Sequence, residues 1–298
     1  GTFIPILSDL KEPKLLARIM DTYRPQFVFH AAAYKHVHLV EMNASAAIIN
    51  NIQTLKNLIE CSIRSGVENF VLISTDKAVN PKGLMGCTKR ACELMISQAA
   101  AQSEKRFCSV RFGNVLGSSG SFIPLLKRQI QHGGPVTITH PDMERYFMLI
   151  PEAVSLVLKA ASFSAPGDIN VLRMGNSIKI LDVAKSIMTL LGKADGEIPF
   201  IFTGIRPGEK LREELYLRGD ELSTTHPDIL VLPRGAGAGA GEAVSALIEQ
   251  ILSLAENDDA SAVSLLKGLV ETSDEGLLAV DGKESLLENV NGNPNWVA

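Results

Sequence analysis

The densest group of potentially reactive side chains in this sequence is Ser74-Thr75-Asp76-Lys77. A carboxylate and an amine stand next to each other at positions 76 and 77, and the local environment can move the pKa of either group toward neutrality. The pair can therefore supply a proton donor and a proton acceptor at one site. The alternative is a solvated acid–base pair at a turn, which has no chemical role.

A second group of interest follows in the segment Met85-Gly-Cys-Thr-Lys89. The segment has a helical pattern, and Lys89 comes one helical turn after Met85, so both side chains point the same way. A lone methionine is more typical of a hydrophobic core than of a catalytic site. The lysine adds a second cation near the first group.

Apolar runs predict the elements that position these groups. Residues 70–74 form a buried strand that leads into the first group, and residues 27–33 and 107–112 form two similar strands. Residues 44–64 lie between the first two strands and have the apolar periodicity of a helix. This alternation predicts a parallel sheet with right-handed crossovers, and hence an α/β fold.

Ligands of such sheets bind outside the carboxyl ends of the strands. One predicted strand end carries His30-Ala-Ala-Ala-Tyr-Lys35, and another carries the group that contains Asp76 and Lys77. We therefore expect both polar groups to face one crevice. A dinucleotide-binding sheet also opens with a strand and a GxGxxG turn, and no such pattern precedes residue 27. Either the chain starts partway through the domain, or it binds no dinucleotide.

The second half of the chain has a different organisation. It contains a loop at 117–121 and a short strand at 136–139, and helices are predicted at 122–132, 151–161, 180–191, 242–256 and 260–287. Alternating Gly and Ala at 235–241 predict a linker. We expect an incomplete Rossmann-like domain at 1–116, a smaller mixed α/β substrate-binding region at 117–232 interleaved with it, and a linker with a helical extension at 233–298.

Composition excludes several classes of function. The 298 residues include 29 Lys and Arg and 33 Asp and Glu, so the net charge of −4 argues against nucleic-acid binding. The four cysteines form no CxxC pair and no His/Cys cluster, so we expect no metal site. No apolar run reaches the roughly 20 residues of a membrane helix, and no signal peptide is recognisable, which predicts a cytoplasmic location.

Five stretches of the sequence resemble a known family. They are HAAAYKHVHLVE (30–41), ISTDKAVNPKGLMGCTKR (73–90), VRFGNVLGSSGSFIPLLKRQI (110–130), GGPVTITHPDMERYFMLIPEAV (133–154) and TGIRPGEKLREEL (203–215). Together they resemble the nucleotide-sugar 4,6-dehydratases of the extended short-chain dehydrogenase/reductase superfamily, in particular the bacterial CapD-like group that acts on UDP-N-acetylglucosamine (UDP-GlcNAc). The resemblance covers residues 1–232. Members of that group often carry a membrane-spanning N-terminal region, so the chain would then be the cytoplasmic domain of an inner-membrane protein.

The resemblance implies an internal redox cycle with NAD as the cofactor. In that family NAD takes a hydride from C4 of the sugar, water leaves across C5 and C6, and the hydride returns to C6. By position, Lys77 resembles the base for the C5 proton and Asp76 the acid for the C6 hydroxyl. Thr75 falls at the hydroxyl that contacts O4, and Lys89 at the lysine that binds the nicotinamide ribose.

Further roles follow from the resemblance alone. Implied cofactor contacts are Asp9 and Leu10, which follow a strand-like segment at 3–7, and the small residues Ala31, Ala32 and Ala33. As a lone residue, Asp9 is more typical of a turn or a cap. Implied contacts to the UDP-sugar substrate are Lys35, Asn114, Arg145, Arg206 and Glu209, because arginine suits a diphosphate and a carboxylate suits ribose hydroxyls.

One departure concerns the residue four positions before Lys89, which is usually a tyrosine that serves as the base for the C4 hydroxyl. Here it is Met85, which cannot titrate. Asp76, Thr75 or an ordered water could then accept the C4 proton. The methionine resembles the membrane-associated enzymes and argues against relatives that invert C5.

The leading hypothesis is a UDP-GlcNAc 4,6-dehydratase for surface glycans. Alternatives are a C5-inverting dehydratase, an enzyme for another nucleotide sugar such as an epimerase, and a non-catalytic sensor of nucleotide sugar or NAD. Relatives of this kind commonly pair, so the family also implies a homo-oligomer.

Overall fold

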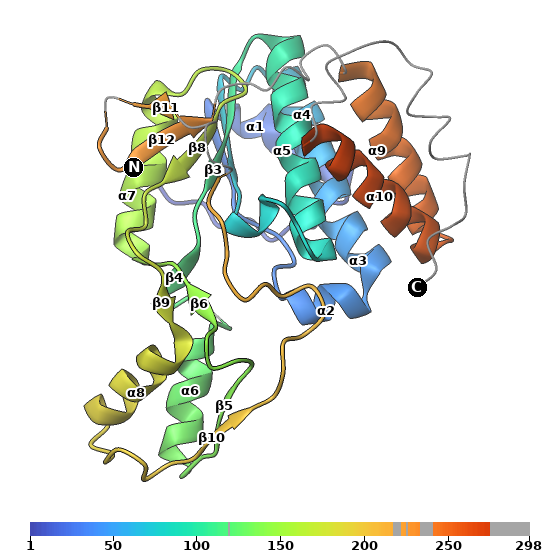
Figure 1. Ribbon diagram of the computed structural model, residues 1–298. Helices are drawn as coiled ribbons and strands as arrows, with labels where there is room; N and C mark the ends of the chain where they lie inside the picture. Colours follow the sequence, from blue (N-terminus) through green and yellow to red (C-terminus); the bar gives the residue numbers. More distant parts are fainter. Residues whose placement is uncertain (119, 217–221, 225, 233–240, 275–298) are drawn as a thin grey trace.

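The computed structural model describes residues 1–298 except 119, 217–221, 225, 233–240 and 275–298. At its centre lies a six-stranded sheet with the strand order β1-β2-β3-β8-β12-β11 (Figure 1). Four neighbouring strands are parallel, and they are β1 (Phe27–His30), β2 (Asn69–Ile73), β3 (Arg106–Arg111) and β8 (Ile169–Leu172). The next strand, β12 (Ile229–Leu232), pairs antiparallel with β8, and β11 (Leu222–Ser223) pairs antiparallel with β12. The predicted α/β fold with parallel strands is confirmed.

The pleat of the central strands separates two hydrophobic cores. Phe70 and Leu72 of β2 face one side with Phe107 of β3, where α1 (Pro13–Tyr23), α4 (Thr54–Arg64) and α5 (Leu84–Ser103) pack. The alternate residues, among them Val71 and Val110, face α7 (Ile150–Phe163) on the other side. Successive side chains of a strand point to opposite faces, so apolar residues on both faces of β2 and β3 are those of strands covered on both sides.

The helix expected at 44–64 consists of three consecutive helical pieces. It begins as α3 (Ala44–Ile48), passes through a π-helical turn η1 (Ile49–Gln53) and continues as α4. A shorter helix, α2 (Val37–Met42), precedes it. The turn places Asn51 in the interior, where it is 2% exposed, and this residue contacts the functional region described below.

The strand-like segment at 3–7 forms no strand. Its side chains are exposed, and none of the described strands pairs with it, so its backbone gains no ladder of hydrogen bonds. The neighbouring strand β1 is an edge of the described sheet, and Phe27 and Phe29 on it are 48% and 43% exposed.

Two C-terminal helices form a further layer. The hairpin of α9 (Gly241–Ala255) and α10 (Asp259–Asp274) packs against α3 and α5 (Figure 1). The expected linker at 235–241 lies outside the described residues except for Gly241, which opens α9. The expected helix at 260–287 is described only to residue 274. No helix in the described ranges has both the length and the apolar character required to cross a bilayer.

A smaller lobe hangs from the carboxyl ends of the parallel strands (Figure 1). Its helices α6 (Phe122–Gln131) and α8 (Ile180–Leu190) pack on a two-stranded sheet of β5 (Val136–Ile138) and β10 (Phe200–Phe202). Two further strand pairs connect this lobe to the main sheet: β4 (Asn114–Leu116) with β7 (Phe147–Leu149), and β6 (Glu144–Arg145) with β9 (Ile178–Lys179). The chain thus crosses repeatedly between the main sheet and the lobe.

Candidate active site

The Thr75-Asp76-Lys77 group lies in a short 3₁₀ turn, η2 (Asp76–Ala78), directly after β2. Backbone bonds hold this turn to the end of β3, since Ser74 N–H donates to the carbonyl of Val110 at 2.7 Å and Asp76 N–H to that of Phe112 at 3.1 Å. The hydroxyl of Thr75 donates to Asp76 Oδ1 at 2.8 Å. The predicted position at the carboxyl edge of the sheet is therefore observed.

Lys77 contacts several polar partners. Its Nζ lies 2.9 Å from Asp76 Oδ1 and 3.5 Å from Asn114 Oδ1, and 3.6 Å from Glu213 Oε1. Burial by itself lowers the pKa of Lys77, but attraction to Asp76 and Glu213 outweighs that effect and holds the pKa above its usual value. Asp76 is fully buried, and its Oδ2 has no hydrogen-bond partner among the described residues.

Helix α5 begins against this turn and carries Met85 and Lys89. Both are buried, at 3% and 7% exposure, and they lie one helical turn apart as the spacing predicts. The Nζ of Lys89 donates to the carbonyl of Ile73 at 2.6 Å, and burial lowers the pKa of Lys89. The helix comes this close because Gly86 has no side chain, since a Cβ there would collide with the carbonyl oxygen of Lys77.

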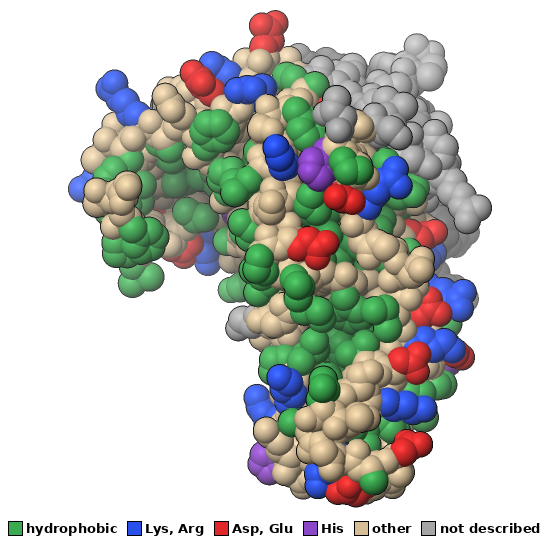
Figure 2. Space-filling model, turned by 90° about the vertical axis from the view of Figure 1, so that its left-hand side faces the viewer, with side chains coloured by type: hydrophobic (Ala, Val, Ile, Leu, Met, Phe, Trp, Pro, Cys, Tyr) green, Lys and Arg blue, Asp and Glu red, His purple; other side chains and the backbone are tan. Residues whose placement is uncertain are grey.

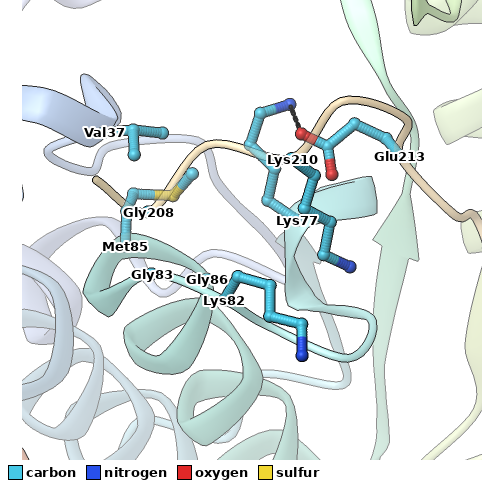
Figure 3. A pocket seen from close by; sticks show the side chains of 9 residues that line it. All are labelled: Val37, Lys77, Lys82, Gly83, Met85, Gly86, Gly208, Lys210 and Glu213. Atoms are coloured by element: carbon cyan, nitrogen blue, oxygen red, sulfur yellow. Dashed lines mark ion pairs between the residues drawn. The ribbon is translucent and has the colours of Figure 1, made fainter. Parts of the chain in front are cut away.

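A small cavity opens beside Lys77. It contains about 230 Å³ of space including its open mouth, and its lining residues are Val37, Lys77, Lys82, Gly83, Met85, Gly86, Gly208, Lys210 and Glu213 (Figure 3). Ligand pockets commonly measure about 300–1,000 Å³. The cavity therefore accommodates part of a ligand, at the place where the amine and carboxylate of Lys77 and Glu213 meet.

Two of the residues predicted to contact substrate join this cluster. Asn114, on β4, accepts from Lys77, while Arg145, on β6, is 8% exposed and lies 3.8 Å from Glu213 through its Nη2. The Nη1 of Arg145 donates to the carbonyls of Glu144 and Leu211 at 2.6 and 3.2 Å.

Arg206 and Glu209 lie on a separate turn. The N–H of Arg206 donates to the carboxylate of Glu209 at 3.3 Å, and Arg206 is exposed. Gly208 of that turn touches the cavity and lies against Gly83 and Glu41, so little room remains between these segments. Glu41 also accepts from the N–H of Leu84 at 2.6 Å, at the start of α5. The turn is thus held beside the cavity.

The residues predicted to contact cofactor lie along two segments. Ala31 and Ala32 are exposed directly after β1, Ala33 is half-buried and Lys35 is exposed. The buried amide of Asn51 holds this loop, accepting from Tyr34 N–H at 2.7 Å and donating to its carbonyl at 3.1 Å.

Asp9 and Leu10 precede α1. The carboxylate of Asp9 accepts from Lys11 N–H at 2.9 Å in an exposed turn, and the carbonyl of Leu10 accepts from Asn57 at 3.1 Å. Asp9 thus stabilises the turn that precedes α1.

Sequence reasoning assigned no role to two buried residues of this region, Glu213 and Asn51. Glu213 falls inside the quoted stretch 203–215, so that stretch was the available signal. Its position beside Lys77 depends on packing between segments far apart in the chain. Among the described residues, no three His, Cys, Asp or Glu side chains come together as a metal site.

The chain matches the family model described as polysaccharide biosynthesis protein over residues 1–233. It is 51% identical over 214 residues to the capsular polysaccharide biosynthesis protein CapD of Staphylococcus aureus, a match that covers 72% of this chain and 36% of that protein. It is 40% identical over 192 residues to a UDP-glucose 4-epimerase of Rickettsia canadensis, covering 63% and 55%. The chain thus spans about a third of the length of CapD.

Solved structures share the fold. The structure of Pen from Bacillus thuringiensis superposes with a TM-score of 0.70 and 32% identity, over 76% of this chain and 71% of that chain. The same fold occurs, at 19–20% identity, in a UDP-glucose 4-epimerase and a dTDP-glucose 4,6-dehydratase that each have NAD bound. The family match covers most of the chain and includes the whole region around Lys77. The chain belongs to the polysaccharide biosynthesis protein family, whose fold is that of the nucleotide-sugar epimerases and dehydratases.

Proposed function

We propose that this chain carries the proton-transfer residues of a nucleotide-sugar 4,6-dehydratase that uses NAD and acts on a UDP-N-acetylhexosamine, in the first place UDP-GlcNAc. The observation that carries the proposal is the 2.9 Å contact between Lys77 Nζ and Asp76 Oδ1 at the carboxyl end of β2. An amine and a buried carboxylate at one point can remove one proton and deliver another, as elimination of water requires.

In the proposed reaction each residue has a defined task. Neutral Lys77 accepts the proton from C5, the C6–O bond breaks, and protonated Asp76 gives its proton to the departing hydroxyl, which leaves as water. Thr75 contacts O4 of the sugar, and the proton of the C4 hydroxyl passes through Thr75 or an ordered water to solvent. Lys77 returns a proton to C5 at the end of the reaction, and Asp76 regains its proton from solvent. NAD, when bound, supplies the site that takes the hydride from C4 and returns it to C6.

The described residues fit part of an NAD site. Ala31 and Ala32 leave an open surface after β1, because neither has atoms beyond Cβ. Lys89, on α5, places its Nζ at the end of the neighbouring strand β2, where it donates to the carbonyl of Ile73. Asp9 and Leu10 are the proposed contacts at the adenine end. These residues would bind the nucleoside portions of NAD, and calorimetric titration with NAD measures the affinity of the chain.

The proposed substrate contacts surround the same cavity. Asn114 and Arg145 lie on the strands that lead into the lobe, while Arg206 and Glu209 lie on the turn beside the cavity. Arg206 is exposed and presents a guanidinium suited to a diphosphate, and Glu209 suits ribose hydroxyls. Lys35 is the contact from the β1 side. The whole protein would act as a homo-oligomer on the cytoplasmic side of the membrane.

A second candidate is a 4-epimerase, which needs no elimination. It is supported by the 40% identity to the Rickettsia canadensis protein named UDP-glucose 4-epimerase. The buried Met85 does not separate the two candidates, because both reactions remove the proton of the C4 hydroxyl and a thioether cannot accept it. The contact between Lys77 and Asp76 favours the dehydratase, since an epimerase moves no proton at C5 and releases no water.

One incubation separates the candidates. The chain is mixed with UDP-GlcNAc and NAD in D₂O and followed by NMR. We expect a 4-keto-6-deoxy product with deuterium at C5. The couplings among H1, H2 and H3, which depend on the ring conformation, report the C5 configuration. An epimerase would instead give UDP-N-acetylgalactosamine without a keto product, and a sensor would bind without turnover. Lys77→Ala should abolish deuterium uptake while UDP-GlcNAc binding persists, and unchanged turnover of this variant would disprove its role as base.

A further inference from the structure

Glu213 is a buried carboxylate to which the proposed reaction assigns no task. Its side chain is 3% exposed, and its Oε1 lies 3.6 Å from Lys77 Nζ and 3.8 Å from Arg145 Nη2. Its Oε2 is buried without a hydrogen-bond partner among the described residues. A buried charge is costly unless opposite charges compensate it, so the two cations are what allow an ionised Glu213 here.

The surrounding charges form a balanced set. Asp76 and Glu213 are the two carboxylates, and Lys77 and Arg145 are the two cations. Asp76 is adjacent to Lys77 in the chain, whereas Glu213 approaches from the segment that follows β10, as the ion pair drawn in Figure 3 shows. Lys77 is therefore held from two independent directions.

Two further titratable groups influence this set. Lys210, on the same segment as Glu213, stabilises the charged form of Glu213. The pKa of Tyr146 is raised mainly by burial, and the charge of Asp76 adds to that rise. The pKa of Glu213 itself is raised, because burial and repulsion from Asp76 outweigh the opposing pull of Lys77 and Arg145.

We propose that Glu213 is a positioning residue that orients the Lys77 amine and governs its protonation. The proposal rests on the proposed function, in which Lys77 must give up its proton before it can serve as a base. Glu213 favours the ammonium form of Lys77, and it also neutralises Arg145, which would otherwise repel that ammonium. Removing the carboxylate takes away an attraction and exposes a repulsion, and both effects favour loss of the proton from Lys77.

The first experiment needs no substrate. The rate at which Lys77 is acetylated by trace acetic anhydride is measured by peptide mass spectrometry between pH 7 and 12, and its midpoint gives the pKa of Lys77 in the full chain. In Glu213→Gln, which keeps the shape and removes the charge, we expect this pKa to fall by about 1 unit or more, the usual effect of an opposite charge at this range.

Glu214→Gln is the matched control. Glu214 is the neighbouring carboxylate, but its side chain is 49% exposed and it pairs with Lys210 at 3.4 Å instead of Lys77. This variant should leave the pKa of Lys77 unchanged. Glu213→Asp retains the charge on a side chain one methylene shorter, so it should give an intermediate pKa, and it serves if the glutamine variant does not fold. An unchanged pKa of Lys77 in every folded Glu213 variant would overturn the proposal.

The second experiment separates this inference from the proposed function. The pH dependence of kcat/KM reports groups of the free enzyme. Turnover needs Lys77 neutral while Asp76 is protonated, the reverse of their ordinary states, so the basic limb of the profile reports the pKa of Lys77. This limb should therefore match the acetylation midpoint and move down by the same amount in Glu213→Gln. If the midpoint moves and the limb does not, Glu213 controls Lys77 as proposed but Lys77 is not the base. If neither moves, the positioning role of Glu213 is refuted.

Discussion

Gly86 of α5 packs against the turn that carries Lys77, and this close contact exists because glycine has no Cβ. The position of the Lys77 amine therefore depends on the absence of a side chain at residue 86. A Cβ at residue 86 would collide with the carbonyl oxygen of Lys77 and would lie 2.8 Å from Pro81 Cβ. Ordinary contacts begin at 3.4 Å, so Gly86→Ala must move the turn or the first turn of α5 by about 0.6 Å or more. The carbonyl oxygen of Lys77 is a backbone atom, so it cannot rotate away from the new Cβ as a side chain could.

Two opposing effects set how much the free energy of unfolding changes in Gly86→Ala. Overpacking costs about 1–3 kcal/mol, while alanine is favoured over glycine within a helix by about 1 kcal/mol. Gly268→Ala, in the middle of α10, has open space around its Cβ and gains only the second effect. The free energy of unfolding should therefore be about 1–3 kcal/mol lower for Gly86→Ala than for Gly268→Ala.

Urea denaturation of both variants, followed by circular dichroism, measures this difference. Under the proposed function, displacement of Lys77 should also lower kcat by about 10-fold to 100-fold, since misplacement by 1 Å costs on the order of 10²-fold. Gly268→Ala should keep the kcat of the parent chain. Equal unfolding free energies for the two variants would refute the steric argument, whatever the activity.

Three further predictions concern buried groups. Glu93→Gln should lower the free energy of unfolding by about 3–5 kcal/mol in urea, because Arg111 loses a carboxylate that its Nε and Nη2 contact at 2.7 and 2.6 Å; a loss below about 1 kcal/mol would contradict this. Burial, aided by repulsion from Lys89, lowers the pKa of His30 to about 4, so the unfolded chain binds a proton near pH 5 that the folded chain does not. Stability should thus fall by about 2 kcal/mol from pH 7 to pH 5, and a His30→Asn variant that falls equally would exclude this cause. Burial raises the pKa of Cys108 to about 11, so Ellman's reagent should label it at pH 8 only after denaturation, and rapid labelling of the native chain would disagree.

The predicted elements that the structure confirms are those with strong local periodicity. Residues 70–74 and 107–112 form β2 and β3 within one residue, because apolar runs of that length suit strands buried on both faces. The segment at 3–7 has a similar pattern but forms no strand, since a strand exists only with a partner. Strands β8 and β12, which also lie inside the sheet, were not predicted from the sequence, so the apolar pattern identified only the first three strands of the sheet.

The candidate site divides in the same way. The position of Thr75-Asp76-Lys77 at the end of β2 follows from local sequence, and so does the one-turn spacing of Met85 and Lys89. The roles of these residues stay predictions that the experiments above test. From the stretch 203–215, Arg206 and Glu209 were predicted to contact substrate and Glu213 was given no role, although its carboxylate lies 3.6 Å from Lys77 Nζ.

Local sequence therefore predicts the α/β class, the first strands and helix of the sheet between residues 27 and 112, and the adjacency of Asp76 and Lys77, because each depends on neighbouring residues or short periodicities. Only the tertiary structure decided which distant groups surround Lys77. Glu213 and Arg145 reach it through long-range packing between the lobe and the sheet, and Gly86 sets how closely α5 approaches. Burial and charge at that junction control the protonation of the amine, and both arise only when segments far apart in the chain come together.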